Sequence, residues 1–115
     1  MLKEPVLYLR HISDECAYLL TVSVNLTKNN FLDDETLKRA VVRSLEIIGE
    51  ASKKIPADYK VLWGSIEWKN MAGMRDRLIH DYMGVNYSIV WDVLVNKIPS
   101  LANQINEVLN SQESK

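Results

Sequence analysis

Residues 37–55 carry apolar side chains at intervals of three and four, which is the spacing of one face of an α-helix. This apolar stripe comprises Leu37, Val41, Leu45, Ile48, Ala51 and Ile55. Its length, about five helical turns, is typical of a helix that packs against others. Asp33 or Asp34 can cap the start of this helix, and Pro56 prevents its continuation. We therefore expect the chain to be organised around one long, packed helix.

Helical spacing also extends over four other segments. The first begins near residues 4–5 and runs to about 25–29, the second covers 68–84, the third follows an N-cap at Asn86, and the last opens at 99–100. Residues 28–33 are expected to be a connection and residues 57–67 to be irregular. Only 4 Gly and 3 Pro interrupt the chain, which favours helices with short connections. The prediction is an all-α fold, an up-and-down bundle of four to five helices.

The size and charge of the chain set further bounds. At 115 residues, with 47% hydrophobic and 25% charged residues, it is predicted to form a single domain over 1–115, with a polar end, 110–115, that frays. The net charge of −1 gives no general attraction to nucleic acid. No apolar run reaches the roughly 18 residues of a membrane span, and the first residues lack the hydrophobic stretch of a signal peptide. We expect a cytoplasmic protein with no membrane contact.

Several residues of types that often carry chemistry are assigned to packing or to the surface. Cys16 lies on the apolar stripe of the first helix and is expected in the core; a single cysteine excludes an internal disulfide framework. His11 flanks that stripe beside Arg10, so we expect it at the surface or partly packed, without a function. Trp63 and Trp68 have apolar neighbours, which favours core or interface packing over stacking on RNA bases.

The best candidates for chemistry lie in residues 68–84, a segment with helical spacing that ends at Gly84. Asp76 and His80 are four apart, so their side chains are neighbours on one face of the predicted helix. A carboxylate in this position can hold one imidazole nitrogen and leave the other free for proton transfer. This pair is therefore a candidate for acid–base catalysis.

Arg75 and Tyr82 are seven apart, which places a planar cation and a phenol on an adjoining stripe of the same helix. Arg75 and His80 are five apart, a rotation of roughly 140° on a regular helix. These two side chains meet only through a bend, a long reach by the arginine or a second subunit. Taken by themselves, Arg75, Asp76 and His80 also fit a polar network that fixes helix packing.

Glu46 and Glu50 are four apart on the central helix and offer a possible paired-carboxylate metal site. The other ligands that such a site needs in a helical bundle, notably a Glu-x-x-His motif, are absent from the sequence. The simpler interpretation is one solvated glutamate and one that pairs with a cation of a neighbouring helix. We predict no metal site and no cofactor.

The pattern Arg75-x4-His80-x-Tyr82 matches the R-x4-6-H motif of the HEPN superfamily, and its extended form resembles that of HepT-type toxins. Blocks around it are also similar to that family, and the resemblance covers about residues 5–110. These blocks are residues 40–51, 68–76, 90–91 and 98–101. The chain departs from the pattern only mildly, with a second arginine at Arg77 and Asp81 between the motif histidine and tyrosine.

The resemblance implies a HEPN-like helical bundle that works as a homodimeric endoribonuclease toxin. It further implies a partner, a small nucleotidyltransferase of the MNT class, which acts as antitoxin by transferring AMP to Tyr82. The motif residues carry over as the catalytic groups Arg75 and His80, with Asp76 as the polar residue beside the arginine. RNA supplies its own nucleophile, the 2′-hydroxyl, so cleavage needs proton transfer and charge stabilisation more than a metal.

A dimer that joins two copies of the motif helix would bring arginine and histidine into one cleft and would gather the RNA-binding candidates Lys69 and Arg77 around it. AMP on Tyr82 would then occupy the place of the scissile phosphate. The alternative function is a catalytically silent helical module that partners a nucleotidyltransferase. Growth arrest on expression of this chain alone distinguishes the toxin from the silent module.

Overall fold

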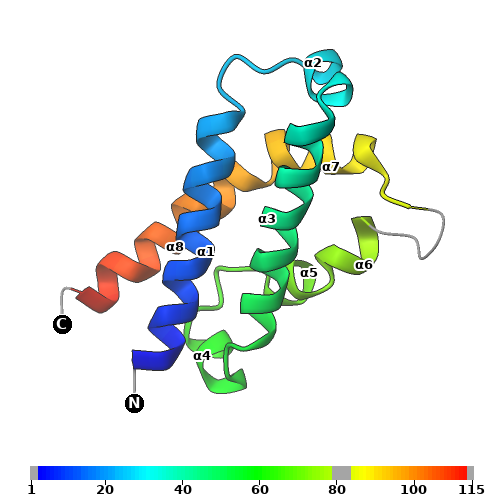
Figure 1. The fold of residues 1–115 in the computed structure, drawn as a ribbon. Coiled ribbons are helices and arrows are strands. Elements are labelled where there is room, and N and C mark those ends of the chain that lie inside the picture. The colour runs from blue at the N-terminus through cyan, green and yellow to red at the C-terminus, as the bar shows by residue number, and fades with distance from the viewer. Residues whose placement is uncertain (1–2, 79–83, 114–115) are drawn as a thin grey trace.

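The structure is a computed structural model that describes residues 3–78 and 84–113. Over these ranges the chain forms eight α-helices and no β-strand (Figure 1). The long helices are α1 (Lys3–Val22), α3 (Glu35–Lys53), α7 (Tyr87–Asn96) and α8 (Ile98–Glu113). The short ones are α2 (Lys28–Asp33), α4 (Ala57–Leu62), α5 (Trp68–Ala72) and α6 (Met74–Leu78). The predicted all-α helical bundle is confirmed. Within the described part of the chain, no helix combines the length and hydropathy needed to cross a membrane.

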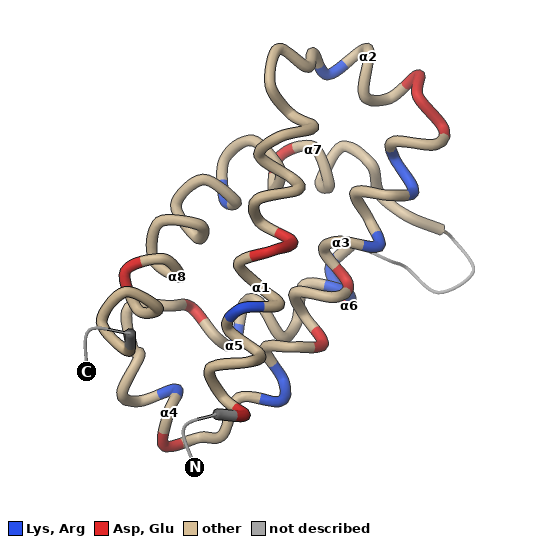
Figure 2. Tube along the Cα trace, turned by 60° about the vertical axis from the view of Figure 1, so that its left-hand side comes forward, with Lys and Arg blue, Asp and Glu red and all other residues tan. Residues whose placement is uncertain are grey.

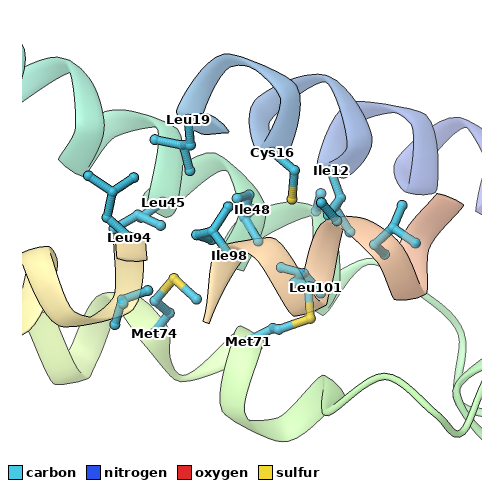
Figure 3. Close-up of a cluster of buried hydrophobic side chains, with 14 of the residues drawn as sticks. Ile12, Cys16, Leu19, Leu45, Ile48, Met71, Met74, Leu94, Ile98 and Leu101 are labelled. Atoms are coloured by element: carbon cyan, nitrogen blue, oxygen red, sulfur yellow. The ribbon is translucent and has the colours of Figure 1, made fainter. Parts of the chain in front are cut away.

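The core lies where α1, α3 and α8 pack together. Figure 1 shows α1 and α3 side by side and antiparallel, and α1 also contacts α8 along its other side. The apolar stripes of these helices interdigitate, as Figure 3 shows for Ile12 and Leu19 of α1, Leu45 and Ile48 of α3, and Ile98 of α8. All five of these side chains have no exposed surface. Burial of such large aliphatic side chains is the main force that holds the bundle together.

Caps predicted from single residues are confirmed at the starts of α3 and α7. The Asp34 carboxylate accepts a hydrogen bond from the Leu37 amide at 2.9 Å, and the Asn86 side chain accepts one from the Ile89 amide at 3.2 Å. These bonds satisfy amides that have no partner within the helix.

The first helix ends at Val22, before the predicted 25–29, and Asn25 then adopts a left-handed φ of 59° that cannot continue it.

The segment predicted as a connection, 28–33, is instead the short helix α2. The hydroxyl of Thr27 accepts a hydrogen bond from the Asn30 amide at 3.1 Å and so caps the helix start. Phe31 anchors the helix because its ring is fully buried and lies 5.5 Å from the ring of Trp91. One cap and one aromatic anchor are enough to hold a helix of six residues. Such a helix is too short to show a periodic pattern in the sequence.

The prediction of an irregular segment over 57–67 is wrong in its first half, which forms α4. Pro56 precedes this helix, where its missing N–H costs nothing. None of its residues is buried, and Val61 and Leu62 are 82% and 64% exposed. A helix without a buried face has no apolar period, which explains why the sequence did not reveal it.

The segment predicted as one helix, 68–84, is broken at Gly73 into α5 and α6. The Gly73 amide donates to the Lys69 carbonyl at 3.0 Å and closes α5, whereas the Gly73 carbonyl accepts from the Arg77 amide at 3.2 Å and begins α6. Apart from proline, glycine is the residue least favourable in a helix interior, because its backbone loses the most conformational freedom on folding. The prediction for 79–83 lies outside the described residues.

Cys16 is buried, as predicted, and its thiol should be chemically inert. The side chain is 1% exposed, and burial, with a contribution from the Glu15 carboxylate, raises the pKa of the thiol to about 12. The thiolate is the reactive form, so at pH 8 only about one folded molecule in ten thousand would carry it. We expect iodoacetamide at pH 8 to leave the native protein unmodified by intact mass and to label it fully in denaturant. Complete labelling of the native protein within minutes would contradict this burial.

Candidate functional site

An ion pair between α3 and α6 fixes the motif arginine. The Nε–H of Arg75 donates to Oε2 of Glu46 at 3.3 Å, across 29 residues of sequence. The Glu46 side chain is 22% exposed and that of Arg75 is 53% exposed, so the pair lies at the rim of the bundle. The bond uses Nε, the nitrogen nearest the side-chain stem, and about half of the arginine side chain remains exposed. An exposed guanidinium edge is suited to a forked contact with phosphate oxygens.

A glycine on α3 allows the close packing that brings these two residues together. Gly49 follows Glu46 by one helical turn, and a Cβ at this position would lie 3.2 Å from the carbonyl oxygen of Met71 in α5. Any larger side chain would therefore push α5 away from α3. Because α6 begins directly after α5, this close approach also sets the distance from Glu46 to Arg75.

The other motif residues are only partly covered by the structure. Asp76 is exposed on α6 beside Arg75. His80 and Tyr82 lie outside the described residues, so the predicted Asp76–His80 contact and the placement of Arg75 and Tyr82 on one stripe stay predictions. On either side of the segment 79–83, the amide of Asn86 donates to the carbonyl of Leu78 at 2.9 Å, so α6 and the start of α7 are directly joined.

The RNA-binding candidate Arg77 lies on a different side of α6 from Arg75. Arg77 follows Arg75 by two residues, a rotation of roughly 200° on a helix. Arg75 accordingly faces α3, whereas Arg77 lines a cavity beside α7 and α8. Lys69 is exposed on α5. Figure 2 shows a basic position of α6 next to charged residues of α3, a helix that carries both positive and negative positions.

The two glutamates considered for a metal site have separate partners. Glu50 pairs with Arg43 of the same helix at 3.4 Å, and Glu46 pairs with Arg75 as described. The expectation that one of them pairs with a cation of a neighbouring helix is confirmed. In residues 3–78 and 84–113, no group of three or more His, Cys, Asp or Glu side chains is placed to hold a metal ion.

The tryptophans before the motif act as packing anchors, as predicted. Trp63 and Trp68 are 4% and 6% exposed, and the indole N–H of Trp68 donates to the Trp63 carbonyl at 3.1 Å. The ring of Tyr59 packs against that of Trp63 with 5.1 Å between centroids. These contacts hold the chain that leads into α5 and leave neither indole free to stack on a base.

Comparison of the sequence with known proteins identifies the family of this chain. A sequence model of the family described as "Ribonuclease HepT-like" matches residues 12–108, which include Glu46, Arg75 and the whole motif. The chain belongs to the HepT-like ribonuclease family. The resemblance stated from the sequence is thereby confirmed at the level of the family.

Relatives in this family cover nearly the whole chain. A protein of Caldanaerobacter subterraneus subsp. tengcongensis named "Putative RNase" is 44% identical over 97% of this chain and 100% of its own length. The "Probable ribonuclease HepT" of Thermococcus cleftensis is 41% identical over 88% of this chain and 92% of its own. No solved structure gives a significant match.

Proposed function

We propose that this HepT-like protein is a metal-independent endoribonuclease that acts as the toxin of a toxin–antitoxin pair in the cytoplasm. The observation that carries the proposal is the family match over residues 12–108, within which the sequence places Arg75, His80 and Tyr82 at the motif spacing. The exposed guanidinium of Arg75, held at its inner nitrogen by Glu46, supports the assignment of that residue.

The chemistry follows from the substrate. The 2′-hydroxyl of RNA attacks the adjacent phosphate, the bond to the 5′-oxygen of the next nucleotide breaks, and a 2′,3′-cyclic phosphate forms. His80, with a reference pKa of about 6.5, is suited to proton transfer near neutral pH. Arg75 stabilises the charge on the pentacoordinate phosphate, and Asp76 orients the imidazole. No cofactor takes part in these steps.

A homodimer would complete this site. On a regular helix Arg75 and His80 are separated by roughly 140°, so one copy of the motif does not bring both groups onto one phosphate without a bend. Two motif copies related by a two-fold axis would supply the arginine and histidine to a shared cleft. We therefore assign activity to the dimer.

The cleavage of natural RNA tests the proposal. Total tRNA and mRNA pools are incubated with the purified chain in the presence of a chelator, after intact mass has shown that Tyr82 carries no AMP. The proposal expects cleavage with 2′,3′-cyclic or 3′-phosphate ends. Products with 3′-hydroxyl ends, or cleavage that the chelator removes, would reject this mechanism. An unmodified dimer that cleaves neither pool would instead favour a silent module that partners a nucleotidyltransferase.

The Tyr82→Phe variant should separate activity from its control by the partner. Phenylalanine keeps the ring but lacks the phenolic oxygen that would attack the α-phosphate of ATP and displace pyrophosphate. We expect RNA cleavage to persist and AMP transfer by the cognate nucleotidyltransferase to disappear, measured by intact mass after incubation with ATP. The matched control is Tyr87→Phe, which changes a half-buried tyrosine of α7. This control variant should still receive AMP on Tyr82. Detection of AMP on the Tyr82→Phe variant would show that another residue is the acceptor.

A further inference from the structure

A cavity of about 400 Å³ lies between the α5–α6 pair and the α7–α8 pair. Its volume falls within the range of roughly 300–1,000 Å³ that is usual for small-molecule sites. Arg77 lies on its wall and follows the motif arginine by two residues. The cavity is therefore adjacent to the candidate catalytic helix but separate from the Glu46–Arg75 pair.

The floor of the cavity is apolar and rich in methionine. Met71, Met74 and Leu101, from α5, α6 and α8, contribute to it, and Figure 3 shows all three in a cluster of buried hydrophobic side chains. They are 4%, 8% and 8% exposed, so what remains accessible is a thin apolar surface. Methionine is flexible and polarisable and adapts to flat aromatic groups, which suits contact with a nucleobase.

The rim of the cavity carries positive charge. Arg77 and Lys97 stand on it, and neither forms an ion pair with another residue that the structure describes. Glu67 is the acidic residue of the lining. Two cations and one carboxylate give a local positive charge in a chain with a net charge of −1. Unpaired cations of this kind attract phosphate.

Amide side chains add the means to recognise a base edge. Asn70 of α5 and Gln104 of α8 both line the cavity. A carboxamide offers both donors and an acceptor, which matches the mixed donor and acceptor pattern of nucleobases. Asn96 also lines the cavity, but its amide already donates to the Asp92 carboxylate at 2.6 Å.

We propose that this cavity binds one nucleotide of the single-stranded RNA substrate, with its base against Met71 and Met74 and its phosphate on Arg77 and Lys97. The inference rests on the proposed ribonuclease function and adds a subsite to it. Since Arg75 and Arg77 lie on opposite faces of α6, an RNA strand that passes over this helix places one phosphate at each. The bound nucleotide is then a near neighbour of the scissile phosphate and sets the base preference of cleavage.

A binding measurement tests the subsite independently of cleavage. The probe is a fluorescent oligoribonucleotide of random sequence with 2′-O-methyl groups, which lack the attacking hydroxyl. The Arg77→Ala/Lys97→Ala variant should bind it at least about 10-fold more weakly in 0.1 M salt, with a salt slope shallower by about 1.4. The control Lys53→Ala/Lys54→Ala removes the same charge from exposed residues that do not line the cavity and should bind within about twofold of wild type.

Methionine methyl NMR shows where the nucleotide lies. The protein is labelled with 13C at its methionine methyl groups, and the variants Met71→Leu and Met74→Leu assign the two signals. AMP, GMP, CMP and UMP are then titrated separately. Inorganic phosphate serves as the control that reports on the charge contribution alone. At least one mononucleotide should shift both methyl signals, more than phosphate does, and the Arg77→Ala/Lys97→Ala variant should lose this response.

The outcomes separate the subsite from the ribonuclease assignment. If the wild type cleaves RNA but the Arg77→Ala/Lys97→Ala variant binds the probe as tightly as the wild type does, the subsite is wrong and the proposed function stands. If nucleotides shift the methyl signals but the unmodified protein cleaves no RNA, the nucleotide site stands and the proposed function fails. Methyl signals that respond to the nucleotidyltransferase partner, and to no nucleotide or probe, would make this cavity a protein-docking surface and overturn the inference.

Discussion

The His80→Ala variant should lose RNA cleavage by a factor of about 10² to 10⁴, which is the usual contribution of a positioned acid–base group. Without the imidazole, no side chain at this position can take the proton of the 2′-hydroxyl or return one to the leaving 5′-oxygen. We expect the loss in kcat and not in RNA affinity, because phosphate binding depends on the arginines and lysines. The measurement is single-turnover cleavage of a mapped RNA substrate, with dimer content checked by size-exclusion chromatography.

The matched control for this variant is His11→Ala, which removes the other histidine of the chain. His11 is exposed on α1, and its ring packs edge-on against Tyr8 with 6.3 Å between centroids. This substitution should leave cleavage unchanged within about twofold, since surface changes away from a site have small effects. Equal rates for the wild type and the His80→Ala variant would remove His80 from the mechanism, even if the protein proves to be a nuclease.

Features set by neighbouring residues in the sequence were predicted well. The caps at Asp34 and Asn86 depend on bonds to amides three residues away, so the local sequence contains the whole interaction. The buried faces of α1, α3 and α8 follow from the 3.6-residue period alone. The same period gave a wrong prediction at Gly73, where it indicated one continuous helix. Met71 before the break and Met74 and Leu78 after it are all buried. The spacing of apolar residues continues where the helix does not.

The central contact of the candidate site could not be predicted in the same way. Glu46 and Arg75 are 29 residues apart and meet because Gly49 lets α5 approach α3, a tertiary effect without a local signature. From the sequence, three roles were open for Glu46: a metal ligand, a solvated side chain or a partner for a cation on another helix. The sequence did not identify that cation. The cavity at Arg77 was missed as well, because four helices contribute to it and a motif shows only one of them.

The Arg75→Ala variant should lower cleavage by about 10² to 10³, the range seen when a donor to a developing negative charge is removed. Arg75→Lys should restore little of this activity, because an ammonium is a point charge and lacks the planar fork that spans two phosphate oxygens. Thermal stability should barely change, since a partly exposed ion pair contributes only about 0–1 kcal/mol. Melting curves and single-turnover rates for both variants test this separation of stability from catalysis.

Glu46→Gln distinguishes the role of the ion pair from the role of the arginine itself. Glutamine keeps an oxygen that can accept the bond from Nε of Arg75 but removes the charge that holds the guanidinium at 3.3 Å. We expect an intermediate loss of kcat, about 3- to 10-fold, with RNA affinity unchanged or slightly higher because a negative charge has been removed near the phosphate. The control is Glu50→Gln, which breaks the similar exposed pair with Arg43 on α3 and should leave kcat as in the wild type. If both glutamine variants cleave at the wild-type rate while Arg75→Ala is inactive, Arg75 acts without being positioned by Glu46.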